Sequence, residues 1–198
     1  MFTGIITHIG RIIEVRPDLT NGLYLKVSMS CDVSAISIGA SLAHNGVCLT
    51  VIDKGDTWLA YDVSPETLDC TTVRNWKINQ RVNIEPALKL GDELGGHLVL
   101  GHVDGMASIG AIEMIGTSYA VSCDLPHAVR RFIAPKGSVT LDGVSLTVNR
   151  VEDEMQQFTV MIVPHTWRET VFSDYRVGDR INLEIDPIAR YIARQMVS

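Results

Sequence analysis

The sequence contains no uninterrupted apolar run approaching the ~18 residues that a membrane-spanning helix requires. Its apolar opening, MFTGIITHIG, has no basic region ahead of it and is interrupted by Gly4, His8 and Gly10, which argues against a secretory signal. Long runs of one charge are also absent, and a formal net charge of −6 disfavours attraction to a nucleic-acid backbone. These absences predict a cytoplasmic protein with neither a membrane nor a nucleic acid as partner.

Cysteine is scarce as well. The four cysteines form no Cys-x-x-Cys pair and show no ligand-like spacing with the six histidines, so no zinc site is expected and reduced thiols are the simplest interpretation. His97 and His102 lie close in the sequence, but the intervening Gly101 argues against a helical metal-binding pair. The composition that is present, 46% hydrophobic and 20% charged residues, is that of a folded globular protein.

The strongest signal in the chain is an internal repeat. SLAHNGVCLTV in the first half aligns without gaps on SVTLDGVSLTV in the second, with six of eleven positions identical. Two shorter matches follow at nearly the same offset, and working backwards by 97 residues pairs the start of the chain with residues 101–103. The repeat predicts two domains of one fold, residues 1–97 and 98–187. The aligned pairs are residues 41–51 with 138–148, 65–67 with 164–166, 81–85 with 180–184, and 4–6 with 101–103.

Each copy of the repeat has the pattern of a small β domain. Short β-branched segments of alternating polarity recur at roughly ten-residue spacing and are separated by turns rich in Gly, Asn and Asp. This pattern predicts antiparallel barrels rather than a parallel sheet with crossover helices. Small helical turns are expected at residues 64–68 and 126–132. The strands expected in the first copy are residues 23–27, 47–51, 58–63 and 81–85.

The end of the chain has no counterpart in the first copy. After Pro187, the apolar residues Ile188, Ile192 and Met196 recur four positions apart, which predicts an amphipathic helix over residues 188–198. The pattern leaves two interpretations open. The helix either folds back on its own barrel or serves as an oligomerisation element.

The two copies differ most in their polar residues. If the repeated loops line a pocket in each domain, the second pocket has groups suited to proton transfer and the first is better suited to holding a ligand; ordinary surface divergence is the alternative. Asn83 and Asn182 recur in both copies, which predicts a structural hydrogen bond for each. The differing pairs are Ile5 and His102, Gly39 and Lys136, Asn45 and Asp142, Cys48 and Ser145, Glu66 and His165, and Ala87 and Asp186.

Six segments form a recognisable series along the chain: MFTGII at 1–6, NGVCLTV at 45–51, GGHLVLGHVDG at 95–105, KGS at 136–138, DGVSLTV at 142–148 and NLEID at 182–186. Together they closely resemble riboflavin synthase of the α-subunit type, and the resemblance covers essentially the whole chain. Leu100 departs from the pattern, which leads us to expect a small or polar residue ahead of Gly101-His102.

The resemblance implies a dismutation in which two molecules of 6,7-dimethyl-8-ribityllumazine exchange a four-carbon unit, giving riboflavin and 5-amino-6-ribitylamino-uracil without a metal or organic cofactor. It implies an all-β fold of two six-stranded Greek-key barrels with a C-terminal helix. It further implies a homotrimer with the active site between subunits, and association with lumazine synthase. Lumazine proteins, which share the fold and only bind the chromophore, are the alternative, and the polar residues of the second copy favour the enzyme.

The resemblance also implies two ligand pockets. The residues expected to be catalytic are Cys48, His102, Lys136, Asp142, Ser145 and Asp186. One pocket is expected to be lined by Gly4, Ile5, Ile6, Cys48, Leu49, Thr50, Asp62, Val63, Ser64, Pro65, Glu66 and Thr67. The other is expected to be lined by Gly101, His102, Val103, Lys136, Ser145, Leu146, Thr147, Ile162, Val163, Pro164, His165 and Thr166.

Overall fold

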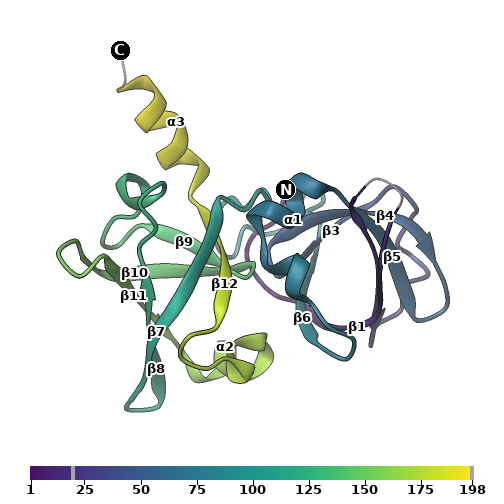
Figure 1. The fold of residues 1–198 in the computed structure, drawn as a ribbon, viewed down its shortest axis with the longest axis horizontal. Coiled ribbons are helices and arrows are strands. Elements are labelled where there is room, and N and C mark those ends of the chain that lie inside the picture. Colours follow the sequence, from purple (N-terminus) through teal and green to yellow (C-terminus); the bar gives the residue numbers. More distant parts are fainter. Residues whose placement is uncertain (19–20, 197–198) are drawn as a thin grey trace.

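The computed structural model describes residues 1–18 and 21–196 of the chain. It contains two closed antiparallel barrels of six strands each, lying side by side (Figure 1). The strands of the first barrel are β1 (His8–Pro17), β2 (Leu23–Met29), β3 (Ser41–His44), β4 (Val47–Lys54), β5 (Trp58–Val63) and β6 (Arg81–Pro86). Those of the second are β7 (Gly105–Ile115), β8 (Ser118–Asp124), β9 (Ser138–Leu141), β10 (Val144–Glu152), β11 (Gln157–Ile162) and β12 (Arg180–Ile185).

Both barrels close with the same strand order. The first is β1-β2-β5-β4-β3-β6, and the second, read from its first strand, is β7-β8-β11-β10-β9-β12. Alternation along β4 illustrates why these segments form a barrel wall, since Val47, Leu49 and Val51 are buried in the core while Cys48 and Thr50 between them are not. The prediction of two tandem six-stranded antiparallel barrels is confirmed.

Short helices close one end of each barrel at repeat-equivalent places. α1 (Pro65–Cys70) with the 3-10 turn η1 (Thr72–Asn75) follows β5, and α2 (Pro164–Glu169) with η3 (Val171–Asp174) follows β11. A third 3-10 turn, η2 (Arg130–Phe132), precedes β9. Both predicted helical turns are therefore present. Among the described residues, no helix is long and apolar enough to cross a membrane.

Residues that correspond in the repeat meet each other where the barrels join. Phe2 and Val99 exchange two backbone hydrogen bonds, with N···O distances of 2.7 and 3.1 Å. Both side chains are almost fully buried. The N-terminus consequently lies between the two barrels (Figure 1), and the contact has the character of a local two-fold axis.

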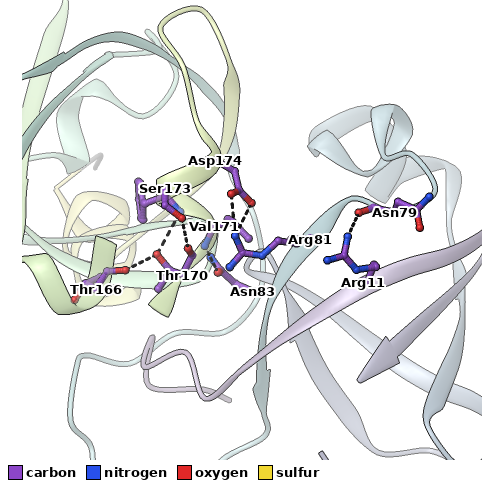
Figure 2. Close-up of polar contacts among 10 residues, drawn as sticks. Arg11, Asn79, Arg81, Asn83, Thr166, Thr170, Val171, Ser173 and Asp174 are labelled. Atoms are coloured by element: carbon purple, nitrogen blue, oxygen red, sulfur yellow. Dashed lines mark hydrogen bonds and ion pairs between the residues drawn. The ribbon is translucent and has the colours of Figure 1, made fainter. Parts of the chain in front are cut away.

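The two repeated asparagines extend this two-fold arrangement. The Asn83 amide donates to the Asp142 carbonyl at 2.9 Å and accepts from the Val171 N–H at 2.9 Å. Asn182 does the same in the opposite direction, donating to the Asn45 carbonyl at 2.9 Å and accepting from the Thr72 N–H at 2.8 Å. The predicted structural hydrogen bonds are confirmed. Figure 2 shows the Asn83 side of the contact, with the ion pair between Arg81 and Asp174 beside it.

The C-terminal helix α3 (Pro187–Gln195) projects away from both barrels (Figure 1). Its first turn is capped by the Asp186 carboxylate, which accepts a hydrogen bond from the Ile188 N–H at 2.8 Å. The predicted helix is present, although residues 197 and 198 lie outside the described residues. Its apolar side chains do not fold over either barrel. The exposed fraction of each large apolar residue along this helix lies between 56% and 79%, for Ile188, Tyr191, Ile192 and Met196.

Candidate functional site

The first six residues cross from one barrel to the other, and we call them strap 1 (residues 1–6). Strap 1 leads into β1 of the first barrel, yet the Gly4 carbonyl accepts a hydrogen bond at 2.8 Å from the N–H of Ser145, on β10 of the second. Gly4 has φ of +78°, and a Cβ there would lie 2.5 Å from the Ser145 Cβ, so this approach requires glycine. Ile6 packs against the core of the second barrel.

The equivalent segment of the second copy, strap 2 (residues 98–103), crosses in the opposite direction. It leads into β7, yet the Gly101 carbonyl accepts a hydrogen bond at 3.0 Å from the N–H of Cys48, on β4 of the first barrel. Gly101 also has a positive φ, and its Cβ would lie 2.6 Å from the Cys48 Cβ. Val103 packs against the core of the first barrel.

The exchange of straps differs from the division of the pockets that the sequence led us to expect. From the sequence, residues 4–6 are expected in a pocket with Cys48, and residues 101–103 in a pocket with Ser145. The structure groups these residues differently, because each strap is hydrogen-bonded to the barrel of the other copy. A repeat alignment assigns a segment to the copy in which it lies along the chain, and it carries no information on exchange between copies.

A hollow of about 260 Å³ surrounds Cys48, and we call it the Cys48 pocket. It brings a thiol, an imidazole and a carboxylate to one place, and its volume is slightly below the ~300–1,000 Å³ of typical ligand pockets. A ligand there would therefore remain partly open to another surface. The lining residues are Val47, Cys48, Glu66, Thr67, Cys70, Thr71, Gly101, His102 and Val103. Val47, Cys70 and Thr71 were not expected. Val47 precedes Cys48 on β4, and α1 places Cys70 and Thr71 beside Thr67 by turning the chain back.

The polar centre of the second barrel consists of Ser145, His97 and Thr140, and we call it the Ser145 site. The Ser145 hydroxyl lies 2.7 Å from Nδ1 of His97, and Nε2 of His97 lies 3.1 Å from the Thr140 hydroxyl. Burial lowers the pKa of His97, with a smaller opposing effect from Asp186. A neutral imidazole that donates from Nε2 to Thr140 is left with Nδ1 as an acceptor for the Ser145 proton.

His97 is a functional candidate that the sequence pattern did not predict, since its spacing to His102 raised only the question of a metal-binding pair. Its equivalent in the first copy would precede Met1, so the comparison of repeats carried no signal for it. Among the described residues, no group of three or more His, Cys, Asp or Glu side chains is placed to hold a metal ion, and all four cysteines are free thiols.

Other expected lining residues lie in the barrel cores or in separate hollows. The buried side chains among them point into the cores, so they can offer a ligand only their backbone: these are Leu49, Val63, Leu146 and Ile162. Thr50 and Thr147 are exposed on β4 and β10, and Ile5 lines a separate hollow beside Glu85. Another hollow is lined by Asp62, Val63, Ser64 and Pro65 with Arg16, Pro17 and Asp18. The first turn of α2 contains Pro164, His165 and Thr166, and Val163 is its N-cap residue.

The three remaining charged candidates lie outside the Cys48 pocket and the Ser145 site. Lys136 is exposed on the turn before β9, and Asp186 caps α3. Asp142 is fully buried where the barrels join, and its carboxylate accepts hydrogen bonds from the Asn182 N–H at 2.8 Å and from the Tyr175 hydroxyl. Burial raises the pKa of Asp142 to about 7. This position suits a structural role for Asp142.

Asp142→Asn is expected to leave kcat within ~3-fold and to flatten the pH dependence of stability. The pKa of Asp142 is raised from 3.8 to about 7 in the folded state. Asp142 therefore contributes to the free energy of unfolding below pH ~4, and this contribution, about 4 kcal/mol at most, is lost as the pH rises through ~7. The amide carries no charge to bury, and Asn45 already accepts from the Asn83 N–H at the equivalent place. Urea unfolding between pH 4 and 8 measures the difference, and a kcat at least ~10-fold lower in a stable variant would assign Asp142 to the chemistry.

Comparison with known proteins places this geometry in a family. A model described as "Lumazine binding domain" matches residues 3–87 and 100–186. Riboflavin synthase of Brucella abortus (strain 2308) is 44% identical over 199 residues, covering 98% of this chain and 97% of the relative. Riboflavin synthase of Photobacterium phosphoreum is 40% identical over 200 residues, covering 100% and 89%. That of Bacillus subtilis (strain 168) is 36% identical over 194 residues, covering 98% and 89%.

Solved structures agree on the fold. The crystal structure of LumP complexed with riboflavin matches with a TM-score of 0.84 at 21% identity, covering 93% of this chain and 99% of that one. LumP complexed with 6,7-dimethyl-8-(1'-D-ribityl) lumazine matches with a TM-score of 0.83 at 19% identity and the same coverage. With both copies matched by the domain model and full-length relatives at 36–44% identity, the chain belongs to the riboflavin synthase family of lumazine-binding duplicated barrels.

Proposed function

We propose that this protein is a riboflavin synthase, which transfers a four-carbon unit between two molecules of 6,7-dimethyl-8-ribityllumazine to give riboflavin and 5-amino-6-ribitylamino-uracil. Likeness to curated riboflavin synthases over nearly the full chain is the observation that carries this conclusion. The geometry agrees with it. A reaction that consumes two copies of one molecule suits two repeat-equivalent sites with different chemical groups.

The Ser145 site is the place we propose for proton transfer. The reaction must remove a proton from the C7 methyl group of one lumazine, whose anion is stabilised by delocalisation into the ring. Ser145, hydrogen-bonded to the buried imidazole of His97, can pass that proton to Nδ1. A positioned acid or base of this kind contributes ~10²–10⁴-fold to a rate.

The Cys48 pocket is the place we propose for the second lumazine, which must be attacked by a nucleophile. The Cys48 thiolate can add to C7 or activate a water molecule, since sulfur is nucleophilic even when a minor fraction is ionised. His102 lies across the same pocket on strap 2. Holding the two ring systems face to face would supply much of the remaining acceleration, because fixed orientation contributes up to ~7–11 kcal/mol.

We propose that the active protein is a homotrimer in which the two sites face each other across a subunit boundary. Two features support this assembly. The apolar side of α3 is exposed in the single chain, and the Cys48 pocket is open to a further surface. Association with lumazine synthase and a cytoplasmic location remain predictions from the sequence.

A binding protein without activity is the second candidate, favoured by the fold likeness to LumP. The two candidates differ in one measurement. Incubating the pure protein with 6,7-dimethyl-8-ribityllumazine and following riboflavin by absorbance is expected to show repeated turnover. Stoichiometric binding with no riboflavin formed would favour the binding protein, whereas the pairing of Ser145 with His97 favours the enzyme.

Cys48→Ser is expected to lower kcat by about 10-fold or more with little change in affinity for riboflavin. A hydroxyl fills nearly the same space as the thiol but is a much weaker nucleophile at neutral pH, so the loss falls on the transition state and amounts to ~1.4 kcal/mol. Steady-state kinetics together with a riboflavin titration separates the two quantities. Normal turnover in a folded variant would leave Cys48 as a packing residue and transfer the nucleophile's role to water.

A further inference from the structure

Two buried glutamates, Glu85 and Glu184, are not used by the proposed reaction, and they occupy equivalent positions in the repeat. Glu85 lies on β6 at the base of strap 1. One of its oxygens accepts hydrogen bonds from the N–H and the hydroxyl of Thr3, both at 2.7 Å, and the other accepts from the Gly4 N–H at 3.0 Å. The side chain is 5% exposed, so these bonds are largely shielded from water.

Glu184 holds strap 2 in the same way from β12. Its two oxygens accept hydrogen bonds from the Leu100 N–H at 2.7 Å and the Gly101 N–H at 2.9 Å. Leu100 corresponds to Thr3 but has no hydroxyl. Glu184 therefore has no counterpart of the hydrogen bond that the Thr3 hydroxyl donates to Glu85. This is the structural consequence of the departure noted at Leu100. Burial raises the pKa of Glu184 to about 6, which still leaves the carboxylate ionised at neutral pH.

The exchange of straps makes each glutamate act on the other barrel. The Gly101 N–H donates a hydrogen bond to Glu184 on one side, and the Gly101 carbonyl accepts one from the Cys48 N–H on the other. Likewise, Gly4 is held by Glu85 and gives its carbonyl to Ser145. The carboxylate of one barrel therefore sets the distance between the strap and the reactive side chain of the opposite barrel.

We propose that Glu85 and Glu184 are positioning residues with crossed effects: Glu184 of the second barrel shapes the Cys48 pocket of the first, and Glu85 of the first shapes the Ser145 site of the second. This inference rests on the proposed function for the identity of the ligand. Charge-assisted hydrogen bonds to paired backbone amides are strong and directional. A strap held by them keeps a fixed place while a ligand binds and leaves.

Glutamine at either position is the sharpest substitution. It keeps the volume and one acceptor oxygen, but its NH2 group faces a backbone N–H, so one bond is replaced by two opposed donors. Glu184→Gln is expected to displace His102 and Gly101 from the Cys48 pocket. Glu85→Gln is expected to displace Gly4 from Ser145 and to leave the Cys48 pocket intact.

Alkylation of Cys48 in the presence of riboflavin measures the Cys48 pocket directly. Each full-length variant is treated with iodoacetamide over a series of riboflavin concentrations, and modification is read by peptide mass spectrometry, with Cys31 as the reference thiol. We expect Glu184→Gln to need about tenfold more riboflavin for half-protection of Cys48. We expect Glu85→Gln to protect Cys48 within ~2-fold of the wild type, although its kcat falls by about tenfold.

The exposed Glu113 on β7 provides the matched control, because Glu113→Gln removes a carboxylate without touching a strap. The proposal would be overturned if each substitution altered only the site in the barrel that carries the substituted glutamate. It would also be overturned if riboflavin protected Cys48 equally in all variants. If a glutamine variant does not fold, Glu184→Asp and Glu85→Asp, which keep the charge but withdraw it by one methylene, are expected to show the same crossed pattern at smaller size. A wild type that binds riboflavin without turnover would refute the proposed function, while the protection experiment would still decide this inference.

Discussion

Ser145→Ala is expected to lower kcat by ~10²-fold or more while leaving the affinity for riboflavin within ~3-fold. The hydroxyl lies 2.7 Å from a buried imidazole whose pKa is lowered by burial. The imidazole is therefore neutral at pH 7 and can take the proton. Alanine removes the proton relay and leaves the surrounding apolar contacts in place. The lower kcat would therefore reflect weaker stabilisation of the transition state. Steady-state kinetics and a riboflavin titration give the two numbers.

His97→Gln tests whether Ser145 and His97 act as one unit. If they do, the double variant is no slower than the worse of the two single variants, because either change alone breaks the relay. Ser118→Ala, on β8 of the same barrel, is the control for loss of a hydroxyl and is expected to retain normal turnover. A Ser145→Ala protein with kcat close to that of the wild type would remove this pair from the proposed chemistry.

Ending the chain at Pro187 is expected to abolish turnover while both barrels stay folded. Helix α3 projects from the second barrel, and its apolar residues contribute to neither core. The helix therefore adds little to the stability of a single chain, and its exposed stripe is available for contact between subunits. If the active site forms only between two subunits, dissociation separates the two lumazines and the benefit of fixed orientation is lost. Light scattering after gel filtration gives the oligomeric state, and thermal unfolding reports on the barrels.

A point substitution separates assembly from other effects of the truncation. The truncated chain also loses Arg190, which forms an ion pair with Asp104 at 2.8 Å close to strap 2. Ile192→Asp keeps that pair and places a charge in the apolar stripe, so it is expected to yield inactive monomers with intact barrels. Arg194→Gln is the matched control on the same helix. A monomeric truncated protein with normal activity would contradict the requirement for assembly.

The duplicated fold could be predicted because its signals are local or periodic. Alternating residues such as those of β4 report which face of a strand is buried, and the Gly and Asp turns report where strands end. The repeat transferred these conclusions from one half to the other. The recurrence of Asn83 and Asn182 likewise predicted hydrogen bonds that the structure contains. The division of the chain at residue 97 and the roles of the site residues remain predictions.

What the sequence determined by itself was the identity of the two sets of chemical groups, since Cys48 and Ser145 are readable from one aligned strand in each copy. Only the tertiary structure decided which strap completes which site, because that depends on contacts across the two-fold arrangement rather than on order along the chain. The same holds for His97, which becomes a partner of Ser145 through folding alone. The side chains of Asp142 and Asn45 differ by a single heavy atom. Only the tertiary structure shows that Asp142 is completely buried where the barrels join, away from the Cys48 pocket and the Ser145 site.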